Sequence, residues 1–113
     1  MAHPTSRREA LTPATFHVLL ALSRGPLHGY AIMRQVEEDA GSQMGPGTVY
    51  GTVGRLEAAG WVEDAGEDTS DPRRGRLFAL TAAGRQALEA EIARIHRLAA
   101  LANERNVVPR EGR

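Results

Sequence analysis

The stretch that decides the fold is GPGTVYGTVGRLEAAG, residues 45–60. Pro46 suits the first turn of a helix, because the amide proton that it lacks would have no partner there, and Gly60 suits the residue just past a helix end. Apolar residues recur inside the stretch at helical spacing and predict one stripe that faces a core: Val49, Val53 and Leu56. The stretch therefore predicts a helix over about 46–59.

A neighbouring face of this helix is expected to carry no large apolar group. At 100° per residue its members are Thr48, Gly51, Thr52 and Arg55. Small polar side chains can approach base edges in the major groove, while an arginine reaches phosphate or guanine. Tyr50 lies on a third face, where its hydroxyl can donate to a phosphate or its ring can pack on the preceding helix. From this segment alone a DNA recognition helix and an ordinary surface helix are both open.

The chain before this stretch predicts two more helices. The first begins at Pro13 after the N-cap Thr12 and ends before Gly25. The second follows residues 28–30 and ends near Gly41. Two helices joined by a short turn, the second with a slim outer face, indicate a helix-turn-helix.

After residue 60 the periodicity changes to that of strands. Residues 61–65 and 76–80 are short strand candidates on either side of a polar loop, 66–75. A helix-turn-helix followed by a two-stranded ribbon is the winged-helix arrangement. The expected class is therefore α+β and mostly α, with a winged-helix DNA-binding domain over 11–80 and a flexible N-terminal arm over 1–10.

A long last helix is predicted over 81–106, capped by Thr81 and about 39 Å long at 1.5 Å per residue. Its apolar residues step 4-3-4-3, the seam of a helix that packs along another helix. Because so small a domain cannot cover that length, we expect the helix to dimerise and residues 107–113 to form a flexible tail. The expected dimerisation residues are Leu88, Ile92, Ile95, Leu98, Ala99 and Ala102.

The composition narrows the function classes. At 113 residues with 42% hydrophobic and 25% charged residues, the chain predicts one globular domain. Fourteen basic and fourteen acidic residues balance, so a nucleic-acid binder of this composition must segregate its charges. The absence of cysteine, of a secretory signal and of a membrane-spanning run indicates a cytoplasmic protein. Neither metal-ligand spacing among the four histidines nor a catalytic constellation is discernible, so we expect no metal, no cofactor and no enzyme activity.

Five short motifs together resemble the PadR family of transcriptional regulators. They are His28-Gly29-Tyr30, Pro46-Gly47-Thr48-Val49-Tyr50, Arg55-Leu56-Glu57, Gly60 and Leu80-Thr81-Ala82-Ala83-Gly84. The resemblance spans about residues 14–100. It implies a winged-helix fold, a homodimer built through the C-terminal helix, palindromic operator DNA as partner and, usually, repression. The single C-terminal helix is similar to a shorter subgroup, some of whose members respond to small aromatic or cationic compounds.

The chain departs from the family pattern at several positions. Gly45, Gly51 and Gly54 replace residues that the family fills with Ser or Thr, Pro, and a basic or polar residue, respectively. The C-terminal helix has no Trp, Phe or Tyr with which a planar effector could stack. The sequence does not identify the residues that would bind an effector.

The wing offers three basic side chains for phosphate or minor-groove contact, Arg73, Arg74 and Arg76. Five acidic residues share the ribbon: Glu63, Asp64, Glu67, Asp68 and Asp71. The expected DNA-contacting set is therefore Thr48, Tyr50, Thr52 and Arg55 on the helix, with the three wing arginines. The alternative is a winged helix that binds another protein through its acidic wing.

Overall fold

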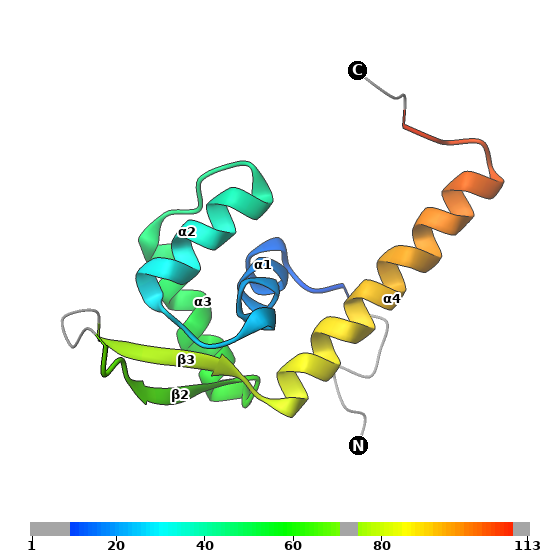
Figure 1. The fold of residues 1–113 in the computed structure, drawn as a ribbon. Helices are drawn as coiled ribbons and strands as arrows, with labels where there is room; N and C mark the ends of the chain where they lie inside the picture. Colours follow the sequence, from blue (N-terminus) through cyan, green and yellow to red (C-terminus); the bar gives the residue numbers. More distant parts are fainter. Residues whose placement is uncertain (1–9, 71–74, 110–113) are drawn as a thin grey trace.

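Four α-helices, a short 3₁₀ turn and a three-stranded sheet form the described part of the computed structural model, residues 10–70 and 75–109 (Figure 1). In chain order the elements are α1 (Pro13–Ala21), the 3₁₀ turn η2 (Leu22–Arg24), β1 (Leu27–His28), α2 (Gly29–Ala40), α3 (Pro46–Ala59), β2 (Val62–Glu67), β3 (Arg76–Leu80) and α4 (Ala82–Glu104). The winged-helix class and the long C-terminal helix expected from the sequence are confirmed.

Helix α1 lies at the centre of the core. The side chain of Thr12 caps it by accepting a hydrogen bond from the backbone N–H of Thr15 at 3.2 Å, and Pro13 occupies the first turn, as predicted. Its buried residues meet those of α2 and α3, which pack on it. The fully buried side chains include Val18, Leu19, Leu22, Ile32, Val36 and Val49. Burial of these apolar side chains is the main source of the domain's stability.

The sheet has three antiparallel strands in the order β1-β3-β2, not the two that the sequence predicted. The two-residue strand β1 pairs with β3, with Leu27 opposite Phe78 and His28 opposite Leu77. Two residues carry no period-2 signal, so this strand is recognisable only through its partner. The pairing ties the turn before α2 directly to the wing.

Strand β3 has the predicted bounds, whereas β2 starts and ends later than expected. Asp64 is opposite Phe78 and Gly66 is opposite Leu77, so one extra residue bulges out of β2 between them. Gly66 has φ +95°, which a residue with a side chain rarely adopts. The bulge lets β2 continue to Glu67, beyond the predicted end at residue 65.

The start of α4 is locked onto the end of α3. The hydroxyl of Thr81 donates to the carbonyl of Gly60 at 2.7 Å and accepts from the backbone N–H of Gly84 at 3.0 Å. The N–H of Thr81 also donates to the carbonyl of Trp61 at 3.0 Å. A Cβ added at Gly84 would overlap that same carbonyl oxygen. This close backbone approach gives a physical reason for glycine at position 84.

Helix α4 divides into two halves. In the first half Gly84, Ala87 and Leu88 are buried in the protomer's own core. Figure 1 shows the second half extending away from the other elements. The helix is 23 residues long, or about 34 Å at 1.5 Å per residue. Leu88 was expected in the dimer seam, and that assignment is wrong because its side chain is already covered within the chain.

Candidate nucleic-acid interface

Helix α3 presents an outer ridge that has almost no side chains. Its buried stripe is Val49, Thr52, Val53 and Leu56. Opposite that stripe, at intervals of four, three and four residues, lie the exposed residues Gly47, Gly51, Gly54 and Ala58. Thr48 and Arg55 border the ridge on one side, and Tyr50 and Glu57 border it on the other, all exposed. A ridge with no side chain larger than methyl allows the helix backbone to approach a partner closely.

Thr52 does not belong to the exposed face. It was expected beside Thr48, but its exposed fraction is 0%. The buried stripe has the spacing i, i+3, i+4, i+7 from residue 49, and Thr52 fills the i+3 place. Its methyl group suits this apolar position, and its hydroxyl accepts a hydrogen bond from Nη2 of Arg55 at 3.1 Å. A side chain in this position cannot touch a base edge.

Arg55 lies along the helix rather than away from it. Besides the bond to Thr52, its Nη1 lies 3.7 Å from where a Cβ at Gly51 would stand. The guanidinium therefore occupies the border of the ridge, one turn before its own Cα. It has donors left for a phosphate or a guanine, because one of its five N–H groups is used here.

Tyr50 packs its ring over the start of α2. A Cβ added at Gly29 would overlap Cε1 of this ring, so the glycine makes room for the aromatic side chain. Tyr50 is still 48% exposed. The ring packs on the second helix, one of the two possibilities that the sequence left open, and donation of the hydroxyl to a phosphate stays a prediction.

Arg76, the one predicted wing contact among the described residues, is engaged by acidic neighbours. Its Nε donates to Oδ2 of Asp64, and its Nη1 lies 3.9 Å from Oε2 of Glu67. Hydrogen bonds from the Gly66 amide and from Arg76 hold the pKa of the Asp64 carboxyl below its ordinary value. The charge of Arg76 is therefore largely balanced inside the wing. Arg73 and Arg74 lie outside the described residues.

Sequence reasoning missed a polar pair at the base of the wing. Nε2 of His28 lies 3.5 Å from Oδ2 of Asp68, and both side chains are largely buried. From the sequence His28 was expected only to help place the turn and the start of the second helix, and Asp68 was counted only as one of the wing's acids. The signal that could have found the pair is the pairing of β1 with β3, which the sequence did not reveal.

The second half of α4 carries an apolar face that no other described element covers. Ile95 is 38% exposed, Leu98 is 46% exposed, and Ala99, one turn after Ile95, is exposed as well. Ile92 is half-buried against the core and marks the boundary between the two halves. Of the expected dimerisation residues, those from Ile95 onward are available to a second chain.

Glu91 is a buried charge on α4 that the sequence analysis did not identify. Arg94 binds it with two hydrogen bonds, Nε to Oε1 at 2.9 Å and Nη2 to Oε2 at 2.7 Å. These bonds hold the pKa of the Glu91 carboxyl below its ordinary value. The backbone N–H of Leu11 also points to Oε1 at 3.5 Å, so this pair joins the chain before α1 to α4.

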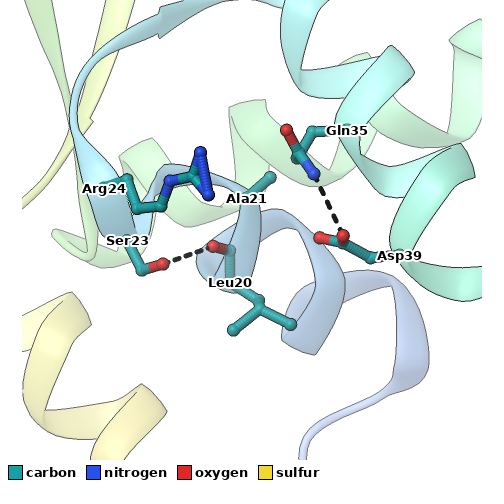
Figure 2. Close-up of a pocket in the computed structure, with 6 residues that line it drawn as sticks. All are labelled: Leu20, Ala21, Ser23, Arg24, Gln35 and Asp39. Carbon is teal, nitrogen blue, oxygen red and sulfur yellow. Dashed lines mark hydrogen bonds between the residues drawn. The ribbon is translucent and has the colours of Figure 1, made fainter.

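A small cavity of about 250 Å³ lies between the end of α1 and helix α2 (Figure 2). Ser23 donates to the carbonyl of Leu20 at 2.7 Å, and Gln35 donates to Asp39 at 3.0 Å. Three of its polar side chains, Ser23, Gln35 and Asp39, are thus already engaged within the wall. The cavity is also smaller than the roughly 300 Å³ at which drug-sized ligand pockets begin.

Within residues 10–70 and 75–109 no three His, Asp or Glu side chains gather as a metal site would require. None of the helices in this described part combines the length and the apolar character of a bilayer span.

A family model described as the transcriptional regulator PadR-like family matches residues 18–90. An uncharacterized 37.1 kDa protein in a transposon of Streptomyces fradiae is 47% identical over 81 residues, which make up 72% of this chain and 22% of that protein. The chain thus spans less than a quarter of the length of this curated relative.

Solved structures of regulators share the fold. A PadR family transcription regulator from Clostridium difficile is similar with a TM-score of 0.70 and 22% identity, over 82% of this chain and 97% of that one. RosR of H. salinarum is similar with a TM-score of 0.63 and 24% identity, over 85% and 94% of the two chains. BpsR of Bordetella bronchiseptica, whose DNA binding is regulated by 6-hydroxynicotinic acid, is similar with a TM-score of 0.67 and 26% identity, over 86% and 64%.

Proposed function

The chain belongs to the PadR-like family of transcriptional regulators, and we propose that it binds a palindromic operator in double-stranded DNA as a homodimeric repressor. The observation that carries the proposal is the exposed ridge of α3, which is slim enough to lie deep in a groove. A regulator of this kind acts on DNA in the cytoplasm. The proposed activity requires no cofactor.

In the proposed complex α3 lies in the major groove with its glycine ridge toward the bases. Thr48 then faces base edges, where a hydroxyl can donate or a methyl can touch thymine. Arg55 and the hydroxyl of Tyr50, on opposite borders of the ridge, reach the two phosphate walls. Thr52 is left out of the contact set because it is buried.

The wing is proposed to lie on the DNA backbone. Arg73 and Arg74 supply its contacts, because Arg76 is engaged by Asp64 and Glu67. Arg76 then serves chiefly to neutralise these acids, so that the phosphate backbone can approach the wing.

The second copy is proposed to pack on the exposed half of α4, through Ile95, Leu98, Ala99 and Ala102. A two-fold axis through this contact presents two α3 helices to two half-sites whose centres lie one helical turn, or a multiple, apart. The palindrome of the operator follows from that symmetry. An effector would have to bind without Trp, Phe or Tyr from α4, because the helix has none of these.

A second candidate function is a protein-binding module. Glu63 and Glu67 are exposed on the wing and could dock a basic partner. A module of this kind would show no salt-sensitive binding to duplex DNA. A single DNA-binding assay at several salt concentrations therefore separates the two candidate functions.

The test is selection of bound sites from random duplex DNA, followed by fluorescence anisotropy on the selected duplex from 50 to 300 mM salt. We expect a palindromic motif and a log–log salt slope of about −0.9 for each phosphate contact. Binding without a motif, or no binding at low salt, would contradict the proposed operator recognition.

A further inference from the structure

The His28–Asp68 pair joins the two regions that the proposed function brings to DNA. His28 ends β1 and is the residue that precedes α2, whereas Asp68 follows β2 at the base of the wing. Their facing atoms, Nε2 and Oδ2, are 3.5 Å apart, and the two side chains are only 10% and 16% exposed. A contact between side chains 40 positions apart thus bridges the helix-turn-helix and the wing.

The second oxygen of Asp68 organises the chain that leads to the wing tip. Oδ1 accepts hydrogen bonds from the backbone N–H of Ser70 at 3.0 Å and from its hydroxyl at 2.6 Å. The backbone N–H of Asp68 donates to the carbonyl of Gly75 at 3.2 Å, which holds the two sides of the wing together at its base. The position of Asp68 therefore fixes that of Ser70 and of the backbone at Gly75.

On the other side His28 is coupled to the recognition helix. The next residue, Gly29, lies under the ring of Tyr50 with no room for a Cβ. A continuous path of contacts therefore runs from Tyr50 on α3, through residues 28–29, to Asp68 on the wing. Movement of the wing relative to α3 would have to break one of these contacts.

A largely buried polar pair of this kind adds little net stability, since its attraction is offset by the loss of hydration, but it does fix geometry. We propose that His28 is a positioning residue for DNA binding: through Asp68 it sets the wing against α3 so that both reach one duplex together. The inference rests on the proposed DNA binding and adds to it a residue that need not touch DNA.

The experiment compares His28→Leu, His28→Gln and Asp68→Asn with the parent protein on a labelled 30-base-pair duplex carrying the selected site. His28→Leu should lower affinity about five-fold and flatten the salt slope by about 0.9 for each wing contact that is lost. His28→Gln keeps an N–H near the place of Nε2 and should restore both values. Asp68→Asn keeps an acceptor for Ser70, loses the charge and should act like His28→Leu.

A double-mutant cycle then isolates the pair from the other contacts of either residue. Adding His28→Leu to Asp68→Asn should cause no further loss, because the coupling is already gone. Glu63→Gln is the matched control for charge: it removes an exposed wing carboxylate and should leave affinity equal to or higher than that of the parent.

The inference is overturned if folded His28→Leu keeps the parent's affinity and slope, or if its loss is unchanged in the Asp68→Asn background. If circular dichroism shows that His28→Leu does not fold, the test rests on Asp68→Asn alone. In that case, an Asp68→Asn variant with the parent's affinity and salt slope would overturn the inference. If the parent protein binds no duplex at low salt, the proposed function itself is overturned. This outcome differs from one in which the parent binds normally and the substitutions at His28 and Asp68 have no effect.

Discussion

Helix α3 and the wing, the two regions proposed to contact DNA, differ in how their surfaces are built. The outer face of α3 has no side chain larger than methyl, because three glycines and an alanine occupy its exposed positions. The wing is built from charge, and among its described residues Arg76 is paired with Asp64 and Glu67. If both regions contact DNA as proposed, we expect recognition to depend more on shape at α3 than on net attraction at the wing.

The largest effect is expected when the empty ridge is filled. Nothing lies within 4 Å of a Cβ at Gly54, so Gly54→Glu should fold. A carboxylate between helix and groove meets like charge in each copy of the dimer, and we expect affinity to fall about a thousand-fold. Anisotropy on the selected duplex measures the loss.

Two controls accompany this substitution. Gly54→Ala should keep DNA affinity within a few-fold and raise the free energy of unfolding by about 0.5–1 kcal/mol, because alanine favours the helix. Gln86→Glu places the same charge at an exposed site of α4 and should bind normally. Gly54→Glu binding within three-fold of the parent would show that the ridge does not face DNA.

The next largest effect is expected when the proposed dimer interface on α4 is disrupted, because a monomer presents only one α3 and one wing to DNA. Ile95→Glu combined with Leu98→Glu places two charges in the proposed interface and should give monomers by light scattering. Loss of the linked second half-site should lower affinity about 100-fold. Ala93→Glu, on the opposite face of α4, should leave the dimer intact. A double variant that remains dimeric would place the interface elsewhere.

A smaller effect is expected at the wing tip. Replacing Arg73 and Arg74 with Ala should flatten the salt slope by about one to two and lower affinity about ten-fold near 150 mM salt, because two phosphate contacts are lost. A slope equal to the parent's would remove both arginines from the interface.

The smallest effect is expected at Arg76. Its partners already balance its charge, so Arg76→Ala should change affinity less than about three-fold and leave the slope within about 0.5 of the parent's. If Arg76→Ala instead matched the double substitution at the tip, the wing would use all its arginines, and the contrast with α3 would weaken.

Much of this fold could be predicted from the sequence, because its main elements are marked by local signals. Pro46 and Gly60 bound α3 as predicted, and Thr81 caps α4. Strand β1 was missed because a two-residue strand has no period of its own and exists through its pairing with β3. The same pairing brings His28 close to Asp68, so the contact between these two side chains could not be predicted from the sequence either.

The errors in the candidate site have a common physical cause, which is that burial depends on tertiary packing rather than on residue type. Thr52 is polar by type, yet its methyl group completes the buried stripe and its hydroxyl finds Arg55. Leu88 continues the same seam as Ile95, but α4 uses the first part of that seam for its own core. The sequence shows one periodic stripe and cannot show where the domain that covers it ends.

The most direct test of the account is binding-site selection with Thr48→Ala, Thr52→Val and the parent protein side by side. We expect Thr48→Ala to relax or change the preferred base at two symmetric positions, with up to about 1 kcal/mol of discrimination lost at each. We expect Thr52→Val, which removes a buried hydroxyl and with it one hydrogen bond to Arg55, to select the parent's motif, because Arg55 is proposed to contact phosphate rather than a base. If Thr48→Ala selects the parent's motif and Thr52→Val does not, the exposed ridge of α3 is not the surface that reads DNA.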